Sequence, residues 1–333
     1  MKRTSRHDRI EKHPACRSTH RACEEWQTDV LTDRKDIQIR QGYSVNKHLI
    51  KYIASLLIFA SNGIVARHIA LNSSQIVLLR TLIGGLMMLA LLVFGKKLHG
   101  PHPAKEMRFV VLSGISMGVS WNLMFTAYEL VGVAVAALLD YCAPIFVLLL
   151  SIVFYREKLT WPVAIGCGAA VAGVLLLSSH TQLNGASPLG AACAILGALF
   201  YALEVLLTKK AETVNGMEIT MWQLFIACAI SFGFTLWRTG VPFAIEGGSW
   251  PYILWLGLVN TGVGCWLFFS SVPHMRAQTV AVCGYLQPMA AVVLAALLLR
   301  ESLTPLQLMG AALVLAGAVC SGQTAKHPVK LRK

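Results

Sequence analysis

The chain has 333 residues, of which 56% are hydrophobic and 14% are charged, and its formal net charge is +13. Soluble domains carry roughly a quarter of charged residues, so this composition excludes an ordinary water-soluble protein. The mean hydropathy of +0.60 and the long apolar runs instead predict an all-α polytopic membrane protein, because a helix satisfies its own backbone hydrogen bonds in lipid. A membrane barrel would show alternating apolar and polar residues.

The positive charge is distributed in a way that argues against a nucleic-acid partner. Twelve of the 29 Lys and Arg residues precede Tyr52, and most of the others lie in short loops. That distribution is typical of membrane orientation signals and not of a basic groove. Seven of the nine cysteines lie inside apolar segments, where they act as small hydrophobic residues, so no disulfide framework is predicted.

Residues 1–47 are polar and basic and lack helical periodicity, so we expect a disordered cytoplasmic tail. Four potential zinc ligands lie in this tail: His13, Cys16, His20 and Cys23. The alternative is a chance cluster in a stretch rich in His, Arg and Cys and interrupted by Pro14. We expect no bound metal and no cofactor.

Ten apolar runs follow, each long enough to cross a bilayer as a helix. They are residues 48–68, 75–95, 108–127, 133–154, 161–178, 188–208, 219–238, 250–270, 277–299 and 304–321. We expect two domains of five helices each, over residues 48–180 and 188–322, and a basic cytoplasmic tail over residues 323–333.

The loops between these runs carry Lys and Arg unequally. With a cytoplasmic N-terminus, thirteen lie on the inner side: Lys96, Lys97, Lys105, Arg108, Arg156, Lys158, Lys209, Lys210, Arg276, Lys326, Lys330, Arg332 and Lys333. The outer side has three: Arg67, Arg238 and Arg300. Positive charge favours the cytoplasmic side, so both termini are predicted to be cytoplasmic, in a multi-pass protein of the cell (inner) membrane.

One stretch of sequence occurs twice, 144 residues apart. Tyr141-x-x-Pro144 precedes an apolar run and then Arg156-Glu157-x-Leu-Thr, and the second copy begins at Tyr285-x-x-Pro288. Because each half has an odd number of spans, the second half enters the membrane from the opposite side. Inverted repeats of this kind are a recurring architecture of secondary transporters.

At these residues the chain resembles the EamA-type transporters of the drug/metabolite transporter superfamily. Besides Tyr141-x-x-Pro144, the resemblance rests on Asn62-Gly63, Arg80 and Glu157-Lys-Leu-Thr160. It covers about residues 48–322. It implies two five-helix halves with a substrate cavity between them, and a protein that moves amino acids or other small metabolites, often outward.

Three charged residues lie clearly inside the predicted spans, where charge is costly and commonly functional. Arg80 either binds cargo or extends to the outer headgroups. Asp140 either handles cargo or protons or is a buried polar group bonded to Tyr or Asn. Glu204 either lines a cavity or pairs loosely with Lys209 or Lys210. A carboxylate in a medium of low dielectric favours its protonated form, so the two acids are candidates for proton coupling.

Further candidates carry π-faces or amides that suit a substrate cavity. They are Asn62, Trp121, Asn122, Tyr141, Tyr201, Trp222, Asn260, Tyr285 and Gln287. For each of these, helix packing or a place in the interfacial aromatic belt is the alternative. Pro144 and Pro288 each free a backbone carbonyl and can kink their helices for gating, binding or packing.

We therefore predict a secondary transporter that carries a small organic metabolite by alternating access, with an outward direction of transport. Its partners would be a small-molecule substrate, the lipid bilayer and protons, and a homodimer is left open. A membrane-embedded enzyme or receptor that uses the in-span acids is the alternative. The chain shows no HExxH motif of zinc proteases, and we do not expect an enzyme.

Overall fold

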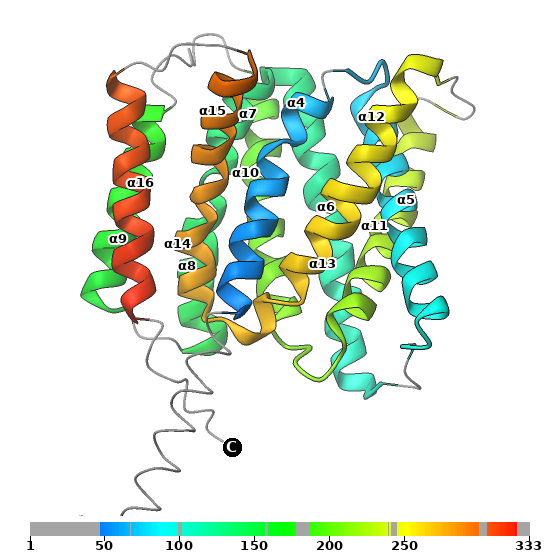
Figure 1. The fold of residues 1–333 in the computed structure, drawn as a ribbon, viewed down its shortest axis with the longest axis horizontal. Coiled ribbons are helices and arrows are strands. Elements are labelled where there is room, and N and C mark those ends of the chain that lie inside the picture. Colours follow the sequence, from blue (N-terminus) through cyan, green and yellow to red (C-terminus); the bar gives the residue numbers. More distant parts are fainter. Residues whose placement is uncertain are drawn as a thin grey trace, which may run out of the picture. The chain divides into compact units, whose positions relative to one another are not determined.

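The structure is a computed structural model, and the residues that it describes are 47–66, 68–98, 102–156, 159–177, 187–238, 240, 245–299 and 305–324. The chain divides into two units, Met1–Lys47 and His48–Lys333, and the description below concerns the second. The predicted N-terminal tail with its four potential zinc ligands, and residues 325–333, lie outside the described part. Every regular element within the described residues is a helix (Figure 1), which confirms the predicted all-α fold class.

The first half has five membrane-spanning segments, and the fourth is broken into two helices. The segments are Lys47–Ala66, which ends in α4 (Asn62–Ala66), α5 (Ser73–Phe94), α6 (Ala104–Val131), α7 (Val133–Asp140) with α8 (Ala143–Tyr155), and α9 (Trp161–Leu177).

The second half repeats the arrangement, and its fourth segment is broken in the same way. Its segments are α10 (Pro188–Thr208), α11 (Gly216–Arg238), Gly247–His274, α14 (Ala277–Gly284) with α15 (Leu286–Leu299), and α16 (Pro305–Thr324). Each of the ten predicted spans coincides with one of these segments to within a few residues. Within the described residues, seven segments are long and apolar enough to cross a membrane, and the α7–α8 segment is one of them. The other three are α9, the α14–α15 segment and α16.

The two broken segments owe their geometry to Pro144 and Pro288. Proline has no backbone N–H, and its ring clashes with the carbonyl four residues earlier, which belongs to Asp140 in one half and to Gly284 in the other. The Cys142 N–H donates to the Leu139 carbonyl at 3.1 Å, and the Tyr285 N–H donates to the Val282 carbonyl at 3.3 Å. Both breaks are therefore short turns with three-residue spacing, placed where the carbonyl of Asp140 or Gly284 loses its helical partner.

The eighth segment contains a π-helix. It begins with η1 (Gly247–Ser249) and α12 (Trp250–Trp255), continues as the π-helix η2 (Leu256–Val263) and α13 (Gly264–Phe269), and ends at η3 (Val272–His274). Within η2 the Thr261 hydroxyl donates to the Leu256 carbonyl at 2.8 Å. π-helices are rare and are frequently found at functional sites, and this one packs against α5.

Helix packing follows an approximate two-fold relation between the halves. Corresponding segments pack on each other, as α5 does on α11, α8 on α14, and α9 on α16. The third segment of one half packs on the first and second segments of the other, as α6 does on α10 and α11 and η2 does on α4 and α5. The halves therefore interlock, and the main hydrophobic cluster contains residues of both.

The contact between α9 and α16 depends on glycine. A Cβ added to Gly173 would lie 2.6 Å from the Gly310 carbonyl oxygen and 2.9 Å from the Val314 backbone nitrogen. A Cβ added to Gly317 would meet the Gly166 carbonyl oxygen. Small residues let helices approach closely in lipid, where van der Waals packing drives association. This helix pair lies at one edge of the view in Figure 1.

Candidate functional site

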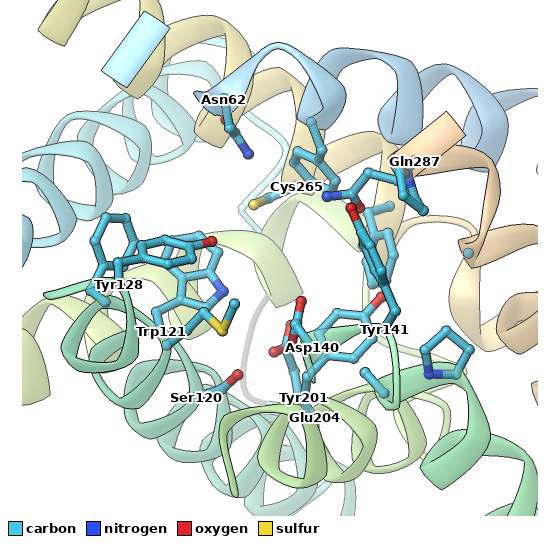
Figure 2. Close-up of a pocket in the computed structure, with 18 of the residues that line it drawn as sticks. Asn62, Ser120, Trp121, Tyr128, Asp140, Tyr141, Tyr201, Glu204, Cys265 and Gln287 are labelled. Carbon is cyan, nitrogen blue, oxygen red and sulfur yellow. The ribbon is translucent and has the colours of Figure 1, made fainter. Parts of the chain in front are cut away.

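A cavity of about 180 Å³ lies between the two halves (Figure 2). Its lining comes from the first segment, α5, α6, the broken α7–α8 segment, α10, α13 and the broken α14–α15 segment. The lining residues are Phe59, Asn62, Arg80, Ser120, Trp121, Met124, Phe125, Tyr128, Asp140, Tyr141, Ala143, Pro144, Tyr201, Glu204, Cys265, Phe268, Phe269, Gly284, Gln287 and Pro288.

Most of the lining consists of pairs of residues at equivalent positions in the two halves. Two pairs are 142 residues apart: Phe59 with Tyr201, and Asn62 with Glu204. Six pairs are 144 residues apart: Trp121 with Cys265, Met124 with Phe268, Phe125 with Phe269, Asp140 with Gly284, Ala143 with Gln287, and Pro144 with Pro288. The cavity therefore lies on the approximate two-fold axis. The halves contribute equally to its shape but not to its charge. Asn62 is equivalent to Glu204, and Asp140 is equivalent to Gly284.

The cavity brings together many of the residues that sequence analysis singles out. Those in the lining are Asn62, Arg80, Trp121, Asp140, Tyr141, Pro144, Tyr201, Glu204, Gln287 and Pro288. Figure 2 shows Asp140, Tyr201 and Glu204 grouped on one side of the space, with Trp121 and Tyr128 on another and Asn62 on a third. Their roles in binding or coupling remain predictions.

Four other candidates lie outside the lining. Asn122 is buried and donates from Nδ2 to the Gly118 carbonyl at 2.7 Å and to Ser231 Oγ at 2.9 Å, so it joins α6 to α11. Asn260 is also buried, and its Nδ2 donates to the Ile58 carbonyl and to Ser61 Oγ, both at 2.8 Å. It thereby joins η2 to the first segment.

The remaining two candidates are aromatic. Tyr285 is buried in the core at the break between α14 and α15. Trp222 is 42% exposed on α11 and therefore belongs to the outer surface of the bundle. Neither ring lines the cavity.

Apart from Trp121 and Tyr201, sequence reasoning missed the apolar part of the lining, although a signal for it existed. Trp121, Met124, Phe125 and Tyr128 follow the i, i+3, i+4, i+7 spacing of one helix face. Adding the repeat offset of 144 to the first three gives Cys265, Phe268 and Phe269, which also line the cavity.

Arg80 is held inside the protein and does not extend to the outer headgroups. Its side chain is 6% exposed, and its guanidinium carbon lies 4.4 Å from the centroid of the Trp121 ring. Arg80 Nε donates to Thr261 Oγ1 at 2.8 Å. A guanidinium prefers to stack on an aromatic face, so α6 and η2 together set the plane of this cation.

The two acids enter the cavity from neighbouring helices. Asp140 is the last residue of α7, beside the break, and Glu204 lies on α10, which packs against α7. Glu204 is 2% exposed. Lys209 and Lys210, the predicted alternative partners of Glu204, hold their ammonium nitrogens 4.7 and 4.8 Å from the centroid of the Tyr155 ring.

Two buried acceptor atoms in the lining have no hydrogen-bond partner within the described residues. They are Glu204 Oε2 and Asn62 Oδ1, from the pair of equivalent positions on α10 and the first segment. A buried polar atom without a partner is costly. A donor that reached either atom would remove this cost.

The bundle is tied together at the end where the first segment begins, here called the Tyr52 end. The buried Tyr52 hydroxyl donates to the Val280 carbonyl at 2.9 Å, and the Tyr155 hydroxyl donates to the Leu206 carbonyl at 2.6 Å. The first bond joins the first segment to α14, and the second joins α8 to α10. The cavity lining extends the other way, towards the α4 end, where it includes Asn62 and Tyr128.

No group of three or more His, Cys, Asp or Glu residues within the described part of the chain is arranged to hold a metal ion. The side chains of the cavity define its chemistry. They offer one fixed cation, two acids, amide side chains and an apolar wall, which together suit binding of a small polar organic molecule.

Ten membrane-spanning segments in two inverted halves, with a polar cavity on the axis between them, define a membrane transporter. The sequence model of the EamA-like transporter family matches residues 47–179 and 188–322. The chain therefore belongs to the EamA-like transporter family.

Individual relatives agree with this assignment. The chain is 29% identical over 253 residues to the uncharacterized transporter YxxF of Bacillus subtilis (strain 168), covering 74% of this chain and 80% of the relative. It is 27% identical over 248 residues to protein PecM of Dickeya dadantii (strain 3937), covering 73% and 82%. A probable terminal-alkyne amino-acid exporter of Streptantibioticus cattleyicolor is 25% identical over 229 residues, covering 65% and 73%.

A solved structure shares the fold. It matches with a TM-score of 0.74 and 18% sequence identity, covering 84% of this chain and 99% of its own. At that identity the similarity concerns the fold alone.

Proposed function

We propose that this protein is a secondary transporter that moves a small organic solute, an amino acid or a close relative, across the cytoplasmic membrane by alternating access. The observation that carries the proposal is the position of the cavity. It lies between inverted halves, and both halves contribute equivalent residues to it. Two such halves can exchange inward- and outward-open shapes around one site.

The size and polarity of the cavity support a small, charged solute. Ligand pockets commonly enclose about 300–1,000 Å³, and this cavity measures about 180 Å³. A solute of amino-acid size suits that space better than a large drug or a nucleotide does. Arg80, Asp140 and Glu204 provide partners for both signs of charge.

The direction of transport is proposed to be outward, with the Tyr52 end in the cytoplasm. The excess of Lys and Arg in the loops at that end supports the orientation. The tyrosine hydrogen bonds there are consistent with closure on the cytoplasmic side while the lining reaches towards the other side. The name of the Streptantibioticus cattleyicolor relative describes an amino-acid exporter.

Protons are proposed as the coupling ion, with Asp140 and Glu204 as their carriers. Each acid is present in one half only, since its equivalents are Gly284 and Asn62. The shared architecture therefore does not require a carboxylate at either position, which favours a role in cargo or proton handling.

Counterflow in proteoliposomes tests the proposal. Liposomes that contain the full-length protein are loaded with the common unlabelled amino acids, and uptake of each radiolabelled amino acid is compared with that of protein-free liposomes. Saturable exchange of at least one amino acid is expected. A membrane-embedded enzyme would instead convert its substrate, and a receptor would bind it without exchange, so either result in place of counterflow would contradict the proposal.

A further inference from the structure

The side chain of Arg80 is oriented by contacts that leave most of its donors free. The Thr261 hydroxyl gives its hydrogen to the Leu256 carbonyl, so its oxygen lone pair is available to accept from Arg80 Nε. Arg80 stacks on Trp121 at 4.4 Å. An arginine side chain has five N–H donors, and those on the two Nη atoms remain for another partner.

The charge of Arg80 is not neutralised by the protein around it. Among the residues that the structure describes, no carboxylate forms an ion pair with Arg80. Arg238, by contrast, pairs with Glu129 at 2.8 Å. A buried, unpaired charge is costly, and Arg80 lines a cavity, so an anionic group in that cavity would remove the cost. The planar fork of a guanidinium matches a carboxylate with two parallel hydrogen bonds.

Acceptors for the opposite charge lie elsewhere in the lining. Glu204 Oε2 is buried and without a partner within the described residues, and Asp140, on the same side of the cavity (Figure 2), adds a second carboxylate. An ammonium group has three donors and no acceptor, so it can satisfy these atoms. The lining also has an apolar part, which includes Phe125 and Phe268.

We propose that Arg80 binds the carboxylate of the cargo and that Glu204 accepts hydrogen bonds from its ammonium group, so that the cargo is a zwitterionic amino acid with an apolar side chain. This assignment rests on the proposed function, because it gives the charged ends of the transported solute to named residues. Asp140 lies beside Glu204 (Figure 2), so a proton on Asp140 and the ammonium group on Glu204 would be neighbours.

The test compares matched compounds on the purified full-length protein in detergent by titration calorimetry. L-Leucine is compared with isoamylamine, which lacks the carboxylate, and with 4-methylpentanoate, which lacks the ammonium group. L-Phenylalanine, 2-phenylethylamine and 3-phenylpropionate form a second set. At least one amino acid should bind roughly 10- to 100-fold more tightly than its amine, because charge-assisted hydrogen bonds to Arg80 are lost with the carboxylate.

Arg80→Gln should reduce the affinity for that amino acid by the same factor and leave the affinity for its amine unchanged. Arg80→Lys keeps the charge but not the fork, and should give an intermediate loss. Arg238→Gln is the matched control, since it removes a cation that is paired outside the cavity, and it should bind as the parent does. If Arg80→Gln does not fold, the comparison of compounds on the parent still decides.

An amine that binds the parent as tightly as its amino acid, a folded Arg80→Gln protein with unchanged affinity, or a failure of every carboxylate compound to bind would overturn the assignment. Counterflow tests transport independently of the binding assignment. A compound that binds through Arg80 but is not exchanged would contradict transport and keep the carboxylate site. Exchange that is unaffected by Arg80→Gln would keep transport and contradict the site.

Discussion

Asp140 and Gly284 occupy equivalent positions in the two halves, and both line the cavity. Each also precedes a proline by four residues, so the backbone carbonyl at each position lacks its helical N–H partner. The difference between them is one carboxylate. An acid that the shared backbone geometry does not need, inside a membrane-spanning segment, is best explained by a solute or proton that it contacts.

Replacing Asp140 by Asn tests this at the scale of one residue. Asparagine keeps the shape and most of the hydrogen bonding but cannot titrate. We expect a folded, membrane-inserted protein whose transport falls at least about tenfold, in line with the loss of one charge-assisted interaction, or no longer responds to a pH gradient. Uptake into proteoliposomes at several imposed pH gradients measures both effects.

Glu129→Gln is the matched control for Asp140→Asn. Glu129 is an acid near the same end of the bundle, but it is 35% exposed and paired with Arg238. Surface ion pairs contribute little, so transport and its pH response should be retained. Parent-like transport by Asp140→Asn at every pH gradient would make Asp140 a structural polar group.

At the scale of elements, the two proline breaks and the glycine contact between α9 and α16 have different roles. The breaks place Asp140, Tyr141, Gly284 and Gln287 around the cavity. The glycine contact lies in a helix pair that contributes no residue to the cavity lining. Changes at the breaks should therefore affect transport, and changes at the glycines should affect stability.

Pro144→Ala supplies the N–H that the Asp140 carbonyl lacks and removes the clash that interrupts the helix. We expect α7 and α8 to join, the thermal stability in detergent to be maintained or raised, and transport to fall severalfold because the cavity lining moves. Pro188→Ala is the control: Pro188 is the first residue of α10, where proline costs no hydrogen bond, so transport should be unchanged. Equal transport by Pro144→Ala and the parent would show that the break is a packing feature only.

Gly173→Ala should lower the stability of the protein, because its Cβ would lie 2.6 Å from a carbonyl oxygen of α16 and only a shift of the helices can relieve that contact. Overpacking of this kind costs about 1–3 kcal/mol, which thermal unfolding in detergent would detect as a lower transition temperature. Gly168→Ala on the same helix is the control, since no atom lies within 4 Å of its added Cβ. An unfolding temperature for Gly173→Ala at or above that of Gly168→Ala would contradict the packing argument.

At the scale of the whole molecule, the interlocked halves make the cavity a product of both. Arg80 of the first half is bonded to Thr261, 181 residues further along the chain, and Tyr52 is bonded to Val280, 228 residues further along. Any rocking of one half against the other must break or form such bonds. Because the halves are inverted, the two ends of the bundle have similar structures. The charge of the loops differs between the two ends.

The proposed orientation predicts which positions react with a reagent that cannot cross the membrane. On a cysteine-free background, Glu246→Cys should be labelled from outside intact cells, and Lys210→Cys should react only after the membrane is opened. Both side chains are exposed, so their reactivity reports the side of the membrane. Ready labelling at position 210 from outside would reverse the orientation and, with it, the proposed direction of transport.

The number, limits and class of the membrane segments could be read from the sequence because each depends on local properties. In lipid a segment must be apolar and must pair its own backbone groups, and both requirements are visible in a window of about 20 residues. The repeat of Tyr-x-x-Pro added the relation between the halves. It also indicated the two breaks, because proline acts on a carbonyl only four residues away.

The composition of the cavity depended on the tertiary structure. Asn122 and Asn260 are as polar as Asn62, yet their amide nitrogens donate to neighbouring helices, whereas Asn62 lines the cavity. For Arg80, the sequence allowed a side chain that extends to the headgroups or one that stays in the interior. Its contacts with Trp121 and Thr261 hold it in the interior. A polar side chain takes whichever partner the packing of distant segments brings within reach, and a single sequence does not record those distances.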